Sequence, residues 1–307
     1  MSAGAPGEHW VVRLFARRRT RRARGSRGTW VIGGLLAVIV LAVVAAPIIA
    51  PDNPTATTSA ILVPPGAGHL LGTDQLGRDV LSRTLYGGRS TLTSAVLAVV
   101  MSTLLGTALG LLAGYSSSLA SSLIMRVMDV ILGFPALLLA LLVLAITGGG
   151  MFPEAIAIAI SFVPVFTRVV YLSTLSLREE GYVTAAKVAG VRDLTILRRH
   201  ILPGVRSEVT VIATSAFGWA ILLGATLSFL GLGAQPPTPD WGADLSAGQS
   251  YLATGWWMSV APGVAITLTV LLVNLLGDRL SSEVPREVPA AAADAEAAIP
   301  TLGTVGR

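Results

Sequence analysis

Long apolar stretches are the feature that most constrains this chain. Residues 30–50 contain no charged side chain, and five further stretches carry two charges or fewer: 91–114, 123–147, 155–175, 209–232 and 256–276. About 20 apolar residues in a helix are enough to cross the hydrocarbon core of a bilayer. Only 13% of all residues are charged, against about 25% in a typical soluble chain. The sequence therefore predicts an all-α polytopic membrane protein with about six transmembrane helices.

The predicted spans divide the chain into segments of different chemistry. Residues 1–28 form an arginine-rich arm, 29–51 the first transmembrane helix, and 52–90 an extracytoplasmic segment with a helix lying on the membrane surface. Residues 91–280 hold the other five helices, with a cytoplasmic loop at 178–206 and an outer loop at 234–255. Residues 281–307 are rich in alanine and have little periodicity, so we expect a disordered tail.

Basic residues set the predicted orientation. The arm contains eight arginines and one acidic residue, and the loop at 178–206 contains six basic residues, whereas none lies between Arg206 and Arg279. Cytoplasmic segments of membrane proteins are enriched in Lys and Arg. We therefore expect both termini and the 178–206 loop in the cytoplasm. Because the net charge of +5 comes from this single arm, the charge distribution gives no support for nucleic-acid binding.

Several classes of catalytic and cofactor site are missing from the sequence. The chain has no cysteine and three scattered histidines, which argues against metal sites and cysteine nucleophiles. Its single lysine, Lys187, follows an alanine, so no G-K-[ST] phosphate-binding loop can be written. We expect neither a catalytic residue nor a metal ligand. If ATP drives this protein, another chain must bind the nucleotide.

The 178–206 loop carries the most informative pattern. Ala185, Ala186 and Ala189 give one small-residue face to a short helix, which Gly190 should end. Asp193 can cap a second helix, and Pro203 should end it. A small face suits insertion into the groove of a partner protein. An ordinary helix-turn-helix connector explains the same pattern equally well from the residues alone.

The spacing of Ala185-Ala186, Gly190 and Leu202-Pro203 resembles the "EAA" loop of the membrane subunits of bacterial ABC importers. Three further strings resemble the dipeptide/oligopeptide/nickel permeases, especially their second, C-type subunit: residues 71–83, 229–242 and 274–278. The resemblance extends from about Arg13 to Leu280. Thr184 stands where the usual glutamate of the loop would be.

This resemblance implies a type I ABC importer transmembrane-domain fold and a set of partners. A paralogous permease, two ATPase subunits that bind ATP and Mg, and an extracytoplasmic substrate-binding protein would join this chain in a bacterial inner membrane. The chain itself would bind no cofactor. Its coupling loop (residues 178–206) would contact an ATPase through these residues: Thr184, Ala185, Ala186, Gly190, Asp193, Leu202 and Pro203. The outer loop would face the binding protein through Pro236, Pro237, Asp240 and Trp241.

Charges inside the spans are few. Arg126 and Asp129 are three residues apart and are expected to pair, and Glu154 is expected near the outer end of its span. Arg168 can extend its guanidinium to the membrane surface or line a transport pathway, because charged groups within a membrane are commonly functional. The residues leave both interpretations open.

The function predicted by the resemblance is that of a non-catalytic permease subunit in an ATP-driven importer, most simply for di- or oligopeptides. Nickel, glutathione and opine importers share the same motifs. A stand-alone secondary transporter or channel is an alternative of a different class, although no chain of intramembrane acids suited to proton relay is present. An integral-membrane enzyme lacks support for want of catalytic motifs.

Overall fold

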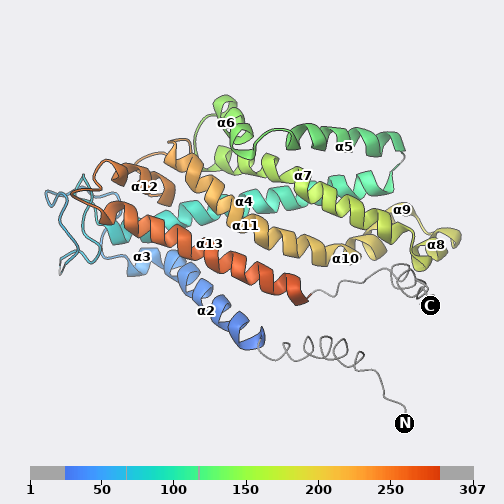
Figure 1. Cartoon of the computed structure of the whole chain (residues 1–307), viewed down its shortest axis with the longest axis horizontal. Helices are drawn as coiled ribbons and strands as arrows, with labels where there is room; N and C mark the ends of the chain where they lie inside the picture. The colour runs from blue at the N-terminus through green and yellow to red at the C-terminus, as the bar shows by residue number, and fades with distance from the viewer. Residues whose placement is uncertain (1–24, 67, 117, 284–307) are drawn as a thin grey trace, which may run out of the picture.

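Parallel and antiparallel helices, packed side by side, form the body of the protein. The computed structural model describes residues 25–66, 68–116 and 118–283, and the regular elements within these ranges are helical. The long helices run lengthwise in Figure 1: α2 (Gly25–Val44), α4 (Val80–Tyr115), α7 (Met151–Arg178), α11 (Arg206–Phe229) and α13 (Trp257–Glu283). The predicted all-α bundle is confirmed.

Four helices in the described ranges, α4, α7, α11 and α13, are long and apolar enough to cross a membrane. A fifth candidate span is the pair α5 (Ser118–Leu132) and α6 (Ala136–Thr147), whose axes differ by 95°. Gly133 and Pro135 lie between the two helices. Proline lacks a backbone N–H and clashes with the preceding turn, so Pro135, the N-cap of α6, favours a break at this point.

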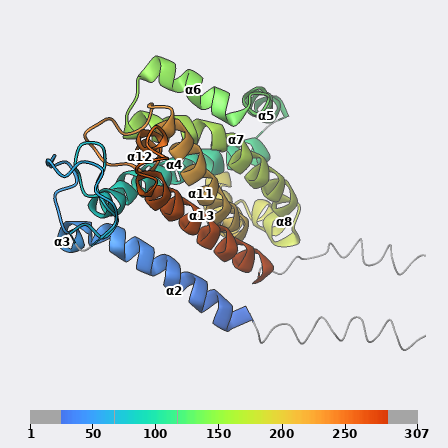
Figure 2. The ribbon, with the colours of Figure 1, turned by 60° about the vertical axis from the view of Figure 1, so that its left-hand side comes forward.

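The first predicted span, 30–50, is shorter in the structure. Helix α2 ends at Val44, and Pro47 lies in the first turn of the four-residue helix α3 (Ala46–Ile49). Helix α2 has 20 residues, fewer than any of the four long spans. Figure 2 shows α2 running along the flank of the bundle next to α13.

Helix α4 packs most extensively against α7, through a ridge of glycines. A Cβ atom at Gly110 would lie 2.7 Å from the carbonyl oxygen of Thr167, and one at Gly114 would lie 2.6 Å from the Cβ of Thr174. Gly106 faces Phe166 in the same way. Lipid tails give apolar helices no reason to associate, so close backbone packing of this kind holds them together.

The helix predicted on the membrane surface within residues 52–90 is instead the first part of α4. Asp79 precedes α4, and its carboxylate accepts a hydrogen bond from the backbone N–H of Ser82 at 2.7 Å. This cap starts a helix that continues without a break to Tyr115. The non-helical segment thus ends at Asp79, about ten residues earlier than the sequence boundary.

Two ends of the bundle carry the irregular structure. The segment between α3 and α4 and the short helix α12 (Trp241–Gln249) lie at one end, and helix α8 (Gly181–Val188) lies at the other (Figure 1). Most of the predicted arginine-rich arm, residues 1–24, and the tail residues 284–307 lie outside the described residues. Both sites predicted from the sequence fall on these two ends.

Candidate functional site

The coupling loop folds into a short exposed helix on an apolar base. Within α8, Val183 is fully buried, while Thr184 and Ala185 are exposed and Ala186 is half-buried. Val188, at the end of the same helix, is 85% exposed. Val183 of α8 therefore faces the bundle, whereas Thr184, Ala185 and Val188 form an exposed surface.

A separate apolar cluster holds α8 against the bundle. Val183 packs with Ile196, Ile201 and Val205 from the second half of the loop, and with Val170 from α7. Ile196 ends the four-residue helix α9 (Asp193–Ile196), and Ile201 ends a π-helical turn, η2 (Leu197–Ile201). Burial of these branched side chains fixes the loop as a folded unit on the bundle, not as a free connector.

Gly190 ends the first helix of the loop, as predicted. Its φ of 75° is left-handed, a conformation that glycine adopts without the clash of a Cβ. The next residue turns back, and the N–H of Val191 donates to the carbonyl oxygen of Ala186 at 3.1 Å. This is a common way for a helix to end.

One prediction about the second half of the loop is wrong. Asp193 does not cap α9: it is the first helical residue after Arg192, and its carboxylate accepts a hydrogen bond from the hydroxyl of Tyr115 at 2.5 Å. The helical run from Asp193 continues through η2 and α10 (Leu202–Gly204) and ends one residue after Pro203, close to the predicted position. Val205 separates this run from α11, which begins at Arg206.

Further contacts join the coupling loop to the last turn of α4. The guanidinium of Arg178 donates to the carbonyl oxygen of Gly114 at 3.0 Å. The ammonium of Lys187 lies 4.9 Å from the centre of the Tyr115 ring, within the range of a cation–π interaction. Tyr115 therefore contacts both halves of the loop.

Two residues of the outer loop that were expected to be exposed are buried. Asp240 and Trp241 are 2% and 1% exposed, so they cannot present themselves to a binding protein in this arrangement. Asp240 caps α12 by accepting from the N–H groups of Gly242 and Ala243, and it also accepts from the Thr91 hydroxyl at 2.9 Å. Burial raises the pKa of Asp240, and these hydrogen bonds oppose the shift. Pro236 and Pro237 are exposed and remain a prediction.

A buried ion network lies next to α12. Both Arg83 Nε and Nη2 donate to Asp244 Oδ1, and Arg83 Nη1 donates to the carbonyl oxygen of Pro54 at 3.0 Å. Arg78 Nε lies 2.6 Å from Asp74 Oδ2. Burial raises the pKa of Asp244 to about 6 despite the neighbouring Arg83. These polar groups fix the outer segment to the end of α4.

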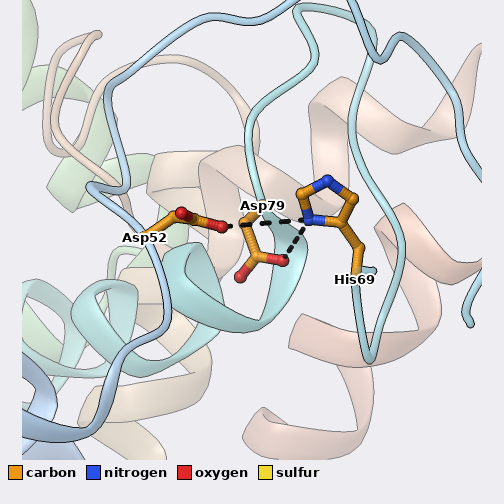
Figure 3. A group of neighbouring side chains, drawn as sticks. All are labelled: Asp52, His69 and Asp79. Atoms are coloured by element: carbon orange, nitrogen blue, oxygen red, sulfur yellow. Dashed lines mark hydrogen bonds and ion pairs between the residues drawn. The ribbon is translucent and has the colours of Figure 1, made fainter. Parts of the chain in front are cut away.

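A histidine joins three parts of the same outer segment. His69 Nδ1 lies 3.1 Å from Asp79 Oδ1 and 3.9 Å from Asp52 Oδ2 (Figure 3). Both oxygens of Asp79 are engaged within the protein, one by His69 and the other as the cap of α4. This group was not predicted from the sequence, although Asp79 and Ser82 have the spacing of a capping residue and its partner.

The intramembrane charges pair differently from the prediction. Asp129 of α5 accepts from Arg168 of α7 at 2.5 Å, and Arg126 is not its partner. The expected Arg126–Asp129 pair is therefore wrong. Glu154 lies in the first turn of α7, as expected, but is 2% exposed. The contact between α5 and α7 brings together two charges that are 39 residues apart.

Comparison with protein families gives one match over the greater part of this structure. Residues 106–284 match the model of the family described as "Binding-protein-dependent transport system inner membrane component". The match includes the glycine ridge of α4, the coupling loop and the outer loop.

Individual relatives match over longer stretches. A putative peptide transport system permease protein of Brucella suis biovar 1 (strain 1330) is 43% identical over 274 residues, covering 88% of this chain and 90% of that protein. A glutathione transport system permease protein of Shigella flexneri serotype 5b (strain 8401) is 48% identical over 216 residues, covering 70% and 71%.

Among solved structures, a chain of the MetNI methionine ABC transporter in an inward-facing conformation aligns with a TM-score of 0.52 at 19% identity. The alignment covers 65% of this chain and 95% of that one. At this identity the likeness is one of fold.

Proposed function

The chain belongs to the family of binding-protein-dependent transport system inner membrane components, and on that premise we propose how it works within an ABC importer. It is the permease subunit, and the surface of α8 that is exposed at Thr184, Ala185 and Val188 is where an ATPase subunit docks. The observation that carries this proposal is the contrast within α8 between the buried Val183 and its exposed small neighbours.

Docking on α8 would transmit movement because the helix is attached to the spans. Val183 is anchored in a cluster that includes Val170 of α7, and Asp193 is bound to Tyr115 at the end of α4. A displacement of α8 by closing ATPase subunits would therefore move α4 and α7 with it. Gly190, Leu202 and Pro203 serve this role indirectly, through the shape of the loop.

The proposed substrate is a peptide with free termini. The names of the two relatives specify peptide and glutathione transport, and glutathione is itself a small peptide. Selectivity would come largely from a separate binding protein, so nickel and opines are outcomes that a transport assay can distinguish.

The complete transporter would contain a paralogous permease, two ATPase subunits and an extracytoplasmic binding protein. ATP and Mg would bind to the ATPase subunits, and this chain would bind no cofactor and catalyse no reaction. Both termini would lie in the cytoplasm, since the basic residues of the arm and of the coupling loop favour that side. Pro236 and Pro237 of the outer loop would then face the binding protein.

The test replaces exposed small residues of α8 and its C-terminal cap by arginine in the co-expressed transporter. Ala185→Arg and Ala189→Arg should prevent docking, because a long charged side chain cannot enter a groove shaped for a methyl group. The matched control is Ser207→Arg, an exposed residue at the start of α11. Membrane insertion, copurification of the ATPase subunits and ATP-dependent peptide uptake in proteoliposomes are measured together.

We expect uptake to fall at least tenfold in both alanine variants, with normal insertion, and to stay within twofold of wild type in the control. Wild-type uptake by Ala185→Arg would overturn the docking surface. A purified chain that transports peptide alone would overturn the permease assignment itself.

A further inference from the structure

The ion pair between Asp129 and Arg168 lies well away from the coupling-loop end of its helices. Arg168 precedes the last residue of α7, Arg178, by ten positions, and Asp129 follows the first residue of α5, Ser118, by eleven. At about 1.5 Å per residue, each charge is roughly 15 Å from the coupling-loop end of the bundle. Both residues lie inside the predicted spans 123–147 and 155–175, six and seven residues from their coupling-loop ends.

Both side chains of the pair are open to the surroundings of the isolated chain. Arg168 is 50% exposed and Asp129 is 54% exposed. Of the residues of α5, Met128 is the one that is buried. The exposed charges therefore lie on a face of the bundle that this chain does not cover.

More polar groups lie on the same face of α5. Ser118, Ser122, Arg126 and Asp129 follow one another at intervals of four, four and three residues, which places them along one side of a helix. A shallow, open hollow on the surface of α5 is lined by Ser122, Met125, Arg126, Asp129 and Val130. This side of α5 thus carries charged groups and hydroxyl groups next to an open hollow.

Lipid is a poor environment for this face. Charged side chains in the middle of a bilayer are expensive, and they usually face a protein interior or a water-filled cavity. The guanidinium of Arg168 is directed to Asp129, a partner that also lies within a predicted span. Water in a transport pathway would remove the cost, since both groups keep part of their surface hydrated.

We propose that Asp129, Arg168 and Arg126 line the translocation pathway and form a subsite for the charged ends of a peptide substrate. This assignment rests on the proposed function. The carboxylate of Asp129 receives the terminal ammonium group, and the guanidinium of Arg168 receives a carboxylate in a two-point hydrogen-bonded contact. Arg126 makes the set net positive by one charge, so a second substrate carboxylate also fits.

Solvent access to the pair is tested by cysteine labelling of the complete transporter, in which this chain contributes no native cysteine. Ser122→Cys keeps both charges, and Asp129→Cys places the thiol at the pair itself. A membrane-impermeant, negatively charged methanethiosulfonate reacts with thiolate, which forms in water. The control is Leu104→Cys in α4, which is 67% exposed and lies eleven residues from Tyr115, at the same depth.

We expect labelling of Ser122→Cys and Asp129→Cys at least tenfold faster than labelling of Leu104→Cys. Equal, slow labelling of all three would overturn the pathway assignment. This measurement needs no substrate, so it remains decisive even if peptide is the wrong substrate and the proposed function fails in that respect.

Substrate contact is tested with Asp129→Asn/Arg168→Gln, which removes both charges and leaves neither unpaired. Uptake of a zwitterionic dipeptide, alanyl-alanine, is measured at saturating loaded binding protein. If the ion pair only stabilised the fold, this replacement by two neutral side chains should leave the rate of uptake unchanged. We expect kcat for uptake to fall at least fivefold, with the concentration of binding protein for half-maximal rate unchanged. Wild-type kcat in this variant would overturn the subsite.

Discussion

The indole Nε1 of Trp241 donates a hydrogen bond of 2.7 Å to the backbone carbonyl oxygen of Thr84, 157 residues earlier in the chain. The ring passes over two glycines of α4. A Cβ atom at Gly88 would lie 2.7 Å from Cζ2 of Trp241, and one at Gly87 would lie 3.2 Å from its Cδ1. The outer loop is therefore fixed to α4 by a buried side chain for which α4 leaves room.

Two substitutions of Trp241 should distinguish the contribution of its hydrogen bond to stability from the contribution of its buried ring. Trp241→Phe should lower the free energy of unfolding by about 1 kcal/mol for the lost hydrogen bond, and Trp241→Ala by about 3–5 kcal/mol for the cavity. Denaturant titration of the detergent-solubilised chain, followed by circular dichroism, measures both. Trp219→Phe, at a residue 63% exposed on α11, should be nearly neutral. Equal losses for Phe and Ala at position 241 would contradict the packing role.

The glycine ridge of α4 should tolerate no methyl group at Gly110. In Gly110→Ala the new Cβ meets the backbone oxygen of Thr167, which cannot move without displacing α7, so we expect a loss of about 1–3 kcal/mol. The matched control is Gly34→Ala in α2, where no atom lies within 4 Å of the added Cβ. That variant should be unchanged or stabilised by up to about 1 kcal/mol. The same titration applies, and a stable Gly110→Ala protein would refute the close approach.

Stability should depend on pH through Asp244. Burial raises its pKa from 3.8 to about 6, so the folded protein binds this proton more tightly than the unfolded chain does. The resulting stabilisation is fully present below about pH 4 and is lost as the pH rises to about 6, by at most about 3 kcal/mol.

Asp244→Asn removes the titrating group, so unfolding free energies measured from pH 4 to pH 7 should change less steeply for this variant than for wild type. The slopes are compared, and not the absolute stabilities, because the variant also leaves Arg83 without its charged partner. Parallel curves for the two proteins would rule out the shifted pKa of Asp244.

Loss of the Tyr115 hydroxyl should loosen the coupling loop without unfolding the bundle. Tyr115→Phe keeps the ring near Lys187 but removes the bond to Asp193, at a cost of about 1 kcal/mol. Hydrogen exchange measured by mass spectrometry should become severalfold faster in residues 193–201, while exchange in the middle of α4 should be unchanged. Equal exchange in both proteins would mean that the apolar cluster alone holds the loop.

The apolar stretches predicted the spans well because length and lack of charge are properties of the sequence itself. The break at Gly133 and Pro135 and the helix end at Gly190 were also predictable, since both depend on local backbone chemistry. The start of α4 was misjudged because hydropathy falls off before Thr91, whereas the helix is extended by the Asp79 cap and by burial against Trp241. Tertiary contacts decided that boundary.

Residue roles that depend on a distant partner were not predictable in the same way. Asp129 has an arginine three residues away, yet it pairs with Arg168 because α5 lies against α7. Asp193 has the chemistry of a helix cap, yet Tyr115 occupies its carboxylate. Asp240 and Trp241 were expected at an exposed surface, and no feature of their sequence indicates that α4 covers them.

Helix α4 has 36 residues and contains no proline, so it extends for about 54 Å, nearly twice the thickness of the hydrocarbon core. One end is bonded to Asp193 and the other to Trp241. Helices α7 and α13 each contain a proline, Pro164 and Pro262, where a helix can kink. In the proposed transporter, a displacement of the coupling loop would therefore reach the Trp241 end of the bundle through α4 as one continuous helix, whereas α7 and α13 can bend at their internal prolines.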